Sequence, residues 1–75
     1  MGLAFVLINT EIGYKERTLE RIREVEGVKV VYMFYGIYVI LITIQAETTS
    51  KLRELVLQIR KIDQVRSTLT MTIVA

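Results

Sequence analysis

The sequence predicts an α+β fold in which strands and helices follow one another in the order βαββαβ. Four segments are short, mostly apolar runs typical of strands, and two others carry apolar residues at the helical spacing of about 3.6 residues. The 75 residues are enough for one small domain. No proline-rich or low-complexity stretch divides them. We therefore expect a single domain over residues 1–75.

The first half of the chain is expected to contain a strand, a helix and a second strand. Residues 3–9 are apolar at both alternating positions, as in a central strand. Residues 14–25 show the helical pattern, with charged side chains around most of the surface. One face of that helix is formed by Thr18, Leu19, Ile22 and Val25. Gly27 stands where a left-handed helix cap is usually glycine, and residues 28–35 follow as the second strand.

The second half begins with a predicted hairpin. Glycine at the first central position of a two-residue loop is typical of a type II′ turn, so Gly36-Ile37 predicts such a turn before a strand over residues 38–45. Thr48 or Thr49 is suited to cap the next helix. Its apolar stripe consists of Leu52, Leu55, Val56, Ile59 and Ile62. Residues 65–74 form the last predicted strand.

These elements make two βαβ halves, each of which requires a right-handed crossover. The result is a ferredoxin-like fold, an antiparallel sheet in the order 4-1-3-2 with both helices on one face. The two strands that become central in this order are the most apolar on both faces. The face without helices would then be apolar and uncovered, which soluble monomers rarely tolerate. We therefore expect the sheets of two copies to pack face to face in a homodimer, and dimers to assemble further.

The composition removes most kinds of catalytic site. The chain has no cysteine and no histidine, so disulfides, thiolate metal sites and histidine-based catalysis are excluded. Its four glycines are isolated and form no phosphate-binding loop. We expect no metal and no cofactor. A dimeric ferredoxin-like enzyme is the rival hypothesis, and the absence of histidine disfavours it, so the chain is not predicted to be an enzyme.

Charge and hydropathy also limit the partners. Ten basic and eight acidic residues are interleaved, so no basic patch indicates direct binding of nucleic acid. Aromatic residues cluster around the hairpin as in RNA-binding sheets, but the signature of those sheets is absent and packing is the commoner role. These aromatics are Tyr32, Phe34, Tyr35 and Tyr38. The longest apolar stretch, residues 30–44, is too short and interrupted to cross a membrane.

Two further expectations concern the setting of the protein. No signal peptide is visible at the N-terminus, so a cytoplasmic protein is expected. The chain has no cysteine, one asparagine and three glutamines, but many charged residues, which favours a thermophilic origin.

The last strand has the clearest alternation in the chain. Apolar and hydroxyl side chains alternate, so one face is apolar and the other carries a row of hydroxyl groups. The two sets are Leu69, Met71 and Ile73 against Thr68, Thr70 and Thr72. Hydroxyls donate and accept hydrogen bonds but need an activating base for catalysis, so they suit recognition of a small polar ligand. The commoner alternative is a solvated outer face, since threonine is a good strand former, and packing between two sheets is a third.

Four segments in this order and spacing resemble the effector-binding (RAM) domain of the Lrp/AsnC feast–famine regulators. They are Ala4–Ile8, Glu26–Val28, Tyr35–Tyr38 and Val65–Thr70, and the match covers essentially the whole chain. The resemblance implies dimers that pair through their sheets and assemble into octamer-like or decamer-like rings, with an amino-acid effector bound between dimers. Members normally carry a helix-turn-helix DNA-binding domain before this one. Here that domain is missing, so a stand-alone domain that signals through a full-length regulator of the family is expected.

The resemblance also implies the ligand-binding residues. These are the hairpin residues Tyr35, Gly36, Ile37 and Tyr38, together with Thr68, Thr70 and Thr72 of the last strand. Gly36 has no Cβ and so could present its backbone N–H to an α-carboxylate. The family's hairpin usually has an aspartate where this chain has Val39. A valine cannot hold a ligand's ammonium group. Val39 therefore indicates either a ligand with different binding requirements or a structural oligomer that has lost ligand binding.

Overall fold

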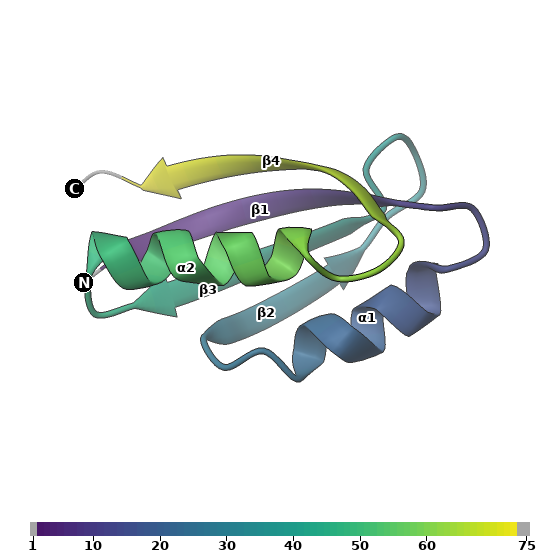
Figure 1. Ribbon diagram of the computed structural model, residues 1–75. Coiled ribbons are helices and arrows are strands. Elements are labelled where there is room, and N and C mark those ends of the chain that lie inside the picture. The colour runs from purple at the N-terminus through teal and green to yellow at the C-terminus, as the bar shows by residue number, and fades with distance from the viewer. Residues whose placement is uncertain (1, 74–75) are drawn as a thin grey trace.

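The computed structural model describes residues 2–73 of the chain. The elements follow the predicted order βαββαβ, as Figure 1 shows. They are β1 (Gly2–Thr10), α1 (Lys15–Arg23), β2 (Val28–Met33), β3 (Ile40–Ala46), α2 (Thr49–Arg60) and β4 (Val65–Ile73). Residue 74 of the predicted last strand lies outside the described residues. No helix among residues 2–73 is long and apolar enough to cross a membrane.

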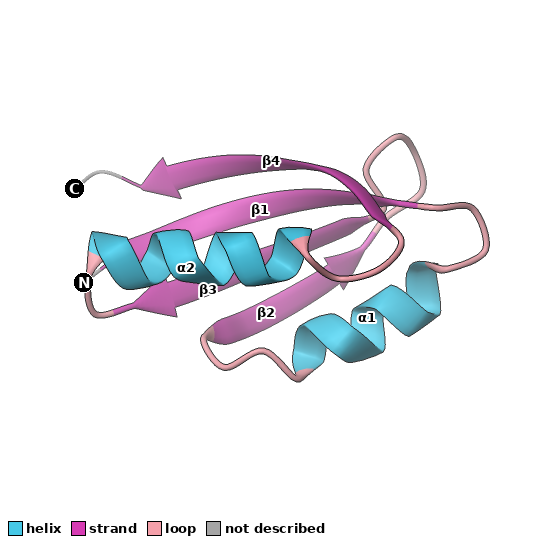
Figure 2. Cartoon of the chain, in the orientation of Figure 1, coloured by secondary structure: helices cyan, strands magenta, loops and turns pink. Residues whose placement is uncertain are grey.

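The four strands form one antiparallel sheet in the order β2-β3-β1-β4. This is the predicted order 4-1-3-2 read from the other edge. Both helices lie on the same side of the sheet, α2 in front of β1 and β3 and α1 beside β2 (Figure 2). The core between the helices and the sheet consists of Ala4, Val6, Ile8, Leu19, Ile22, Ile40, Ile42, Ile44, Leu52 and Ile59.

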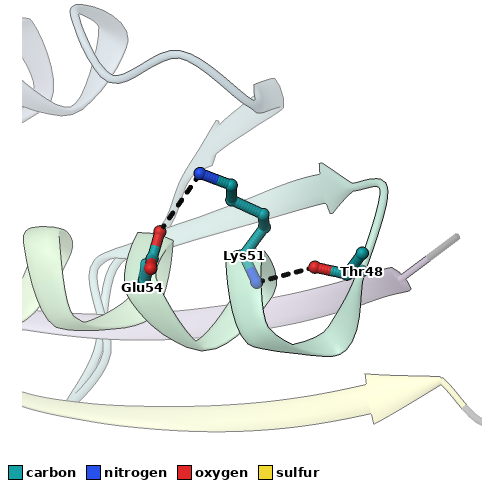
Figure 3. Close-up of polar contacts among 3 residues, drawn as sticks. All are labelled: Thr48, Lys51 and Glu54. Carbon is teal, nitrogen blue, oxygen red and sulfur yellow. Dashed lines mark hydrogen bonds and ion pairs between the residues drawn. The ribbon is translucent and has the colours of Figure 1, made fainter.

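Both helices bury the faces that their sequences predict. In α1 the buried residues are Thr18, Leu19 and Ile22, and in α2 they are Leu52 and Ile59. The helix expected over residues 14–25 is shorter at both ends, because after Arg23 the backbone tightens into bonds of the i→i+3 kind, such as Val25 N–H to the Ile22 carbonyl (3.0 Å). Thr48 caps α2, since its Oγ1 accepts from the Lys51 N–H at 3.1 Å, as drawn in Figure 3.

The predicted two-residue hairpin is wrong in its length and right in its register. Met33 pairs with Ile40, which is the register of a turn centred on Gly36-Ile37. Strand pairing nevertheless stops there, and the last bond across the hairpin runs from the Phe34 N–H to the Val39 carbonyl (2.7 Å). β3 pairs with β1 only as far as the same Ile40, although β1 continues to Thr10 beside β4, and among the described residues no strand pairing is present at the hairpin tip. The φ of Gly36 is +143°, far from the value of about +60° in a type II′ turn.

Thr18 is a buried polar residue without a hydrogen bond for its side chain. It is fully buried in the core side of α1, and among the described residues its Oγ1 has no partner. A buried hydroxyl that is left unpaired costs about 1–3 kcal/mol, so replacing it by a methyl group of the same shape removes that cost. We expect Thr18→Val to leave the free energy of unfolding in urea unchanged or to raise it by about 1 kcal/mol. A loss of stability would show that the hydroxyl has a partner in solution, and Thr10→Val, which removes an Oγ1 that bonds the Glu11 carbonyl (3.2 Å), is the matched control.

Candidate functional site

The structure places the hydroxyl row of β4 on the same side of the sheet as the helices. Thr68, Thr70 and Thr72 lie opposite Ile8, Val6 and Ala4 of β1, and these three β1 side chains are fully buried beneath the helices. Directly opposite residues share a face of the sheet. The threonines therefore lie neither on the helix-free face nor between two sheets that pack through that face. Because β4 is an edge strand, Thr68 and Thr70 are half-buried and Thr72 is exposed.

The opposite face of the sheet, which we call the open sheet face, is apolar. Leu7 pairs with Leu41 on one side and with Leu69 on the other, and Phe5 pairs with Met71. The face comprises Leu3, Phe5, Leu7, Val30, Tyr32, Leu41, Leu69, Met71 and Ile73, together with the polar residues Thr43, opposite Phe5 and Val30, and Gln45, opposite Leu3. Six of these are exposed, between 36% for Leu3 and 54% for Tyr32. Such a continuous apolar surface is typical of a face that another protein surface covers.

The hairpin tip is the second exposed apolar feature. Tyr35 and Ile37 are 97% and 79% exposed, and around a Cβ built on Gly36 no atom lies within 4 Å. Among residues 2–73, no partner is found for the backbone N–H groups of residues 35–38. The tip therefore presents consecutive free donors next to a glycine whose positive φ disfavours other residues. Within one protomer this surface is open and forms no enclosed pocket.

A residue that sequence reasoning missed lies beside the hairpin. Lys15, at the start of α1, places its Nζ 4.7 Å from the centroid of the Tyr35 ring. The loop between β1 and α1 and the hairpin lie at the same end of the molecule in Figure 1, which brings these two residues together. Ile12 of that loop is 94% exposed. No sequence signal links a lysine at position 15 with a hairpin twenty residues later, because their contact depends on the sheet order.

The seven predicted ligand-binding residues do not all meet within one protomer. Thr68 is at the hairpin end of β4, because it pairs with Ile8, whose carbonyl oxygen accepts from the Val39 N–H (3.0 Å). Thr72 is four residues further along, about 13 Å away at the rise of a strand. β1 lies between β4 and the strand that carries the hairpin. A site that uses both sets therefore needs groups from more than one copy of the chain.

The surface also has a concave region at the end of the molecule away from the hairpin. A groove of about 730 Å³ lies between α2 and the start of β2. Its lining carries both signs of charge, with Lys29 and Lys51 against Glu26, Glu47 and Glu54. Lys51 and Glu54 form an exposed ion pair at 3.6 Å (Figure 3). None of the seven predicted residues lines this groove. Among the described residues, no cluster of three or more acidic, histidine or cysteine side chains could hold a metal ion.

Comparison with known proteins identifies the family. The Lrp/AsnC ligand binding domain matches residues 3–75. The chain belongs to this family. The resemblance found in the sequence is thereby confirmed, and the Lrp/AsnC match is to a ligand-binding domain and not to a catalytic one. No curated protein matches the chain by sequence.

Solved structures agree with the Lrp/AsnC assignment. The crystal structure of FFRP-DM1 superposes with a TM-score of 0.93 at 28% identity, covering 99% of this chain and 100% of that chain. The hypothetical protein PHS023 from Pyrococcus horikoshii gives a TM-score of 0.90 at 28% identity, covering 100% and 92%. AsnC from E. coli gives 0.90 at 21% identity, covering 99% of this chain and 51% of that chain. At that identity the likeness to AsnC shows the shared ferredoxin-like fold.

Proposed function

We propose that this Lrp/AsnC domain is an oligomeric sensor of a small metabolite, an amino acid or a related compound. The ligand binds where hairpins of neighbouring dimers meet, at Tyr35, Gly36, Ile37 and Tyr38, with Thr68, Thr70 and Thr72 contributed by the last strand. The observation that carries this proposal is the hairpin tip around the exposed Gly36, where the backbone N–H groups of residues 35–38 have no partner among residues 2–73. Oriented backbone N–H groups of this kind are suited to a carboxylate.

The open sheet face supports the homodimer. Two copies packed through this face would remove its exposed apolar side chains from water, and each Å² of apolar surface that is buried stabilises by about 25 cal/mol. The arrangement is an aligned pair of sheets, with the helices on the two outer faces. The hairpin tips and the loops beside them remain outside this dimer. They are therefore available for contacts between dimers, in octamer-like or decamer-like rings.

The proposed mechanism is a population shift. A ligand that binds between dimers stabilises whichever assembly it fits best, by no more than its difference in affinity for the two states. We propose that the domain works in the cytoplasm and changes the activity of a full-length Lrp/AsnC regulator that shares its interface. It would have no catalytic activity and no direct contact with nucleic acid or membrane. The mass of the native protein, measured from its source, tests whether it is a single domain.

A second candidate function is a structural oligomer that has lost ligand binding, and Val39 is the observation that favours it. The Val39 backbone is held by hydrogen bonds on both sides, and its side chain packs against the core. Val39 therefore contributes apolar packing at the base of the hairpin and no charge that could bind a ligand. In this alternative the assembly forms but responds to no metabolite.

Gly36→Asp separates the two functions. We expect the wild-type protein to be an oligomer whose melting temperature rises by about ten degrees or more with an effector at about 100 times its Kd. Gly36→Asp should abolish that rise and keep the assembly mass, because the new carboxylate repels a bound carboxylate. The measurement is light scattering and thermal unfolding with each of the twenty amino acids and related metabolites at millimolar concentration.

Gly36→Asn is the matched control, since its side chain has the same size and no charge. It should keep more of the ligand response than Gly36→Asp. An assembly that no metabolite shifts would favour the structural oligomer. A monomer would contradict both functions.

A further inference from the structure

The backbone N–H groups of the hairpin tip bear on which class of small metabolite the site could bind. Four consecutive residues, 35–38, have backbone N–H groups without a partner among the described residues. These groups can only donate hydrogen bonds, so they select for an acceptor. Their exposure at the tip makes them accessible to a ligand that a neighbouring copy encloses.

A cation stands beside these donors. The Lys15 ammonium lies over the Tyr35 ring, 4.7 Å from its centroid. An ammonium held against an aromatic face is attracted to the ring's electrons and is thereby restricted to one part of the surface. The half-buried Lys15 thus supplies a positive charge at the hairpin. Positive charge and N–H donors together are suited to a carboxylate, with which they form charge-assisted hydrogen bonds.

Within the described part of one protomer, no acidic side chain is placed at the hairpin for a ligand's ammonium as Lys15 is for a carboxylate. The hairpin residues 34–39 contain no acidic side chain. Glu11, in the loop beside the hairpin, pairs with Arg66 through Oε1 and Nε at 3.6 Å. Glu16 follows Lys15 in α1, but successive helix residues are turned by about 100° around the axis, and Glu16 is exposed. An ammonium at the hairpin would therefore lose water without gaining a carboxylate partner, and Lys15 would repel it.

We propose that the ligand of this site is a small carboxylate that carries no ammonium group, of the type of a 2-oxo acid. This inference rests on the proposed function, since it assigns the ligand class of the same hairpin site. The ligand's carboxylate accepts from the N–H groups around Gly36 and faces Lys15. Its uncharged α-position lies where the hairpin offers backbone groups, apolar side chains and tyrosine hydroxyls, none of which carries a negative charge. The site thus distinguishes an amino acid from its deaminated counterpart by the group at the α-carbon.

The test compares matched pairs that differ only at the α-carbon. Calorimetry on the full chain in its assembled form measures the affinity for pyruvate and alanine, 4-methyl-2-oxopentanoate and leucine, and 2-oxoglutarate and glutamate. The assembled protein is used so that groups from a neighbouring copy take part. We expect one oxo acid to bind at least about tenfold more tightly than its amino acid, because an ammonium group without a partner in the site lowers the binding affinity by about that factor. Lys15→Gln should reduce the affinity for that oxo acid about tenfold, whereas Lys29→Gln, at the opposite end of β2, should leave it unchanged.

The other possible outcomes each contradict a different part of the inference. An amino acid that binds as tightly as its oxo acid, or more tightly, would overturn the ligand class and leave the sensor function standing. Tighter binding of an oxo acid that Lys15→Gln does not weaken would overturn the role of Lys15 in selecting it. If no member of any pair binds at 10 mM, an upper limit of roughly millimolar affinity, the ligand class fails, and the screen with the twenty amino acids and related metabolites decides separately whether the proposed sensor function fails with it.

Discussion

Leu69→Lys is expected to dissociate the proposed homodimer into folded monomers. Leu69 lies on the open sheet face, between the exposed edge of β4 and Leu7 of β1, and is 47% exposed in the single protomer. A monomer therefore tolerates a lysine there, because the long side chain reaches water. In the dimer two lysines would be enclosed, one from each copy, and an unpaired charge in an apolar interface costs several kcal/mol. We expect the dissociation constant to rise by about a thousandfold or more.

Leu57→Lys is the control for this experiment. Leu57 is 49% exposed, nearly the same as Leu69, but it lies on α2 and not on the open sheet face. Light scattering over a dilution series should give the mass of the wild-type assembly for Leu57→Lys and a monomer for Leu69→Lys, with the same circular dichroism for both. If the two variants dissociate equally, the interface is not the open sheet face. If neither dissociates, the face-to-face dimer is wrong.

Among the four glycine-to-alanine substitutions, Gly27→Ala is expected to be the most destabilising. A Cβ at Gly27 would lie 2.7 Å from Leu55 Cδ1 and 3.2 Å from the Gln45 carbonyl oxygen, and the φ of Gly27 is +102°. The Gly27 carbonyl also accepts from the Gln45 N–H at 2.9 Å, so the backbone cannot shift away without loss of that bond. Steric overlap of this kind costs about 1–3 kcal/mol, and the positive φ adds to that cost. We expect the free energy of unfolding in urea to fall by about 2–3 kcal/mol.

Gly13→Ala separates the two contributions. Gly13 also has a positive φ, +87°, but a Cβ added there would have no atom within 4 Å. It should therefore show only the conformational cost of about 1 kcal/mol. The double variant Gly27→Ala/Leu55→Ala should lose less stability than the sum of its single variants, since the shorter side chain removes the overlap. Equal losses for Gly27→Ala and Gly13→Ala would contradict the close contact with Leu55.

Most of the fold could be predicted from local sequence patterns. The helical spacing identified the buried residues of α1 and α2, and the preference of threonine for helix caps named Thr48 as one of two candidates. The apolar character of both faces in the first and third strands identified them as central. The hairpin shows where local rules end. Gly36-Ile37 predicted the register correctly, but not that strand pairing stops at Met33 and Ile40, where the pairing of β3 with β1 also ends.

The candidate site was less predictable than the fold. The alternation in the last strand shows that Thr68, Thr70 and Thr72 share a face, but period two does not tell which face the helices cover. Pairing with the buried β1 residues Ala4, Val6 and Ile8 decides this, and it is a tertiary contact. The position of Lys15 over Tyr35 has the same origin. Whether the seven predicted residues bind a ligand stays a prediction.

The pairing of β4 with β1 links correct folding to association. Thr68 lies opposite Ile8, and the pairing becomes irregular between Asn9 and Thr10. A slip of one residue would turn every β4 side chain to the other face. Leucine, methionine and isoleucine would then lie on the side of α2, and the threonines would lie on the open sheet face. The monomer would expose less apolar surface, and the proposed dimer would bury less of it. The observed register leaves the apolar residues of β4 on the open sheet face, where the second copy of the proposed dimer would cover them, so a strand mispaired by one residue would be recognised by its failure to assemble.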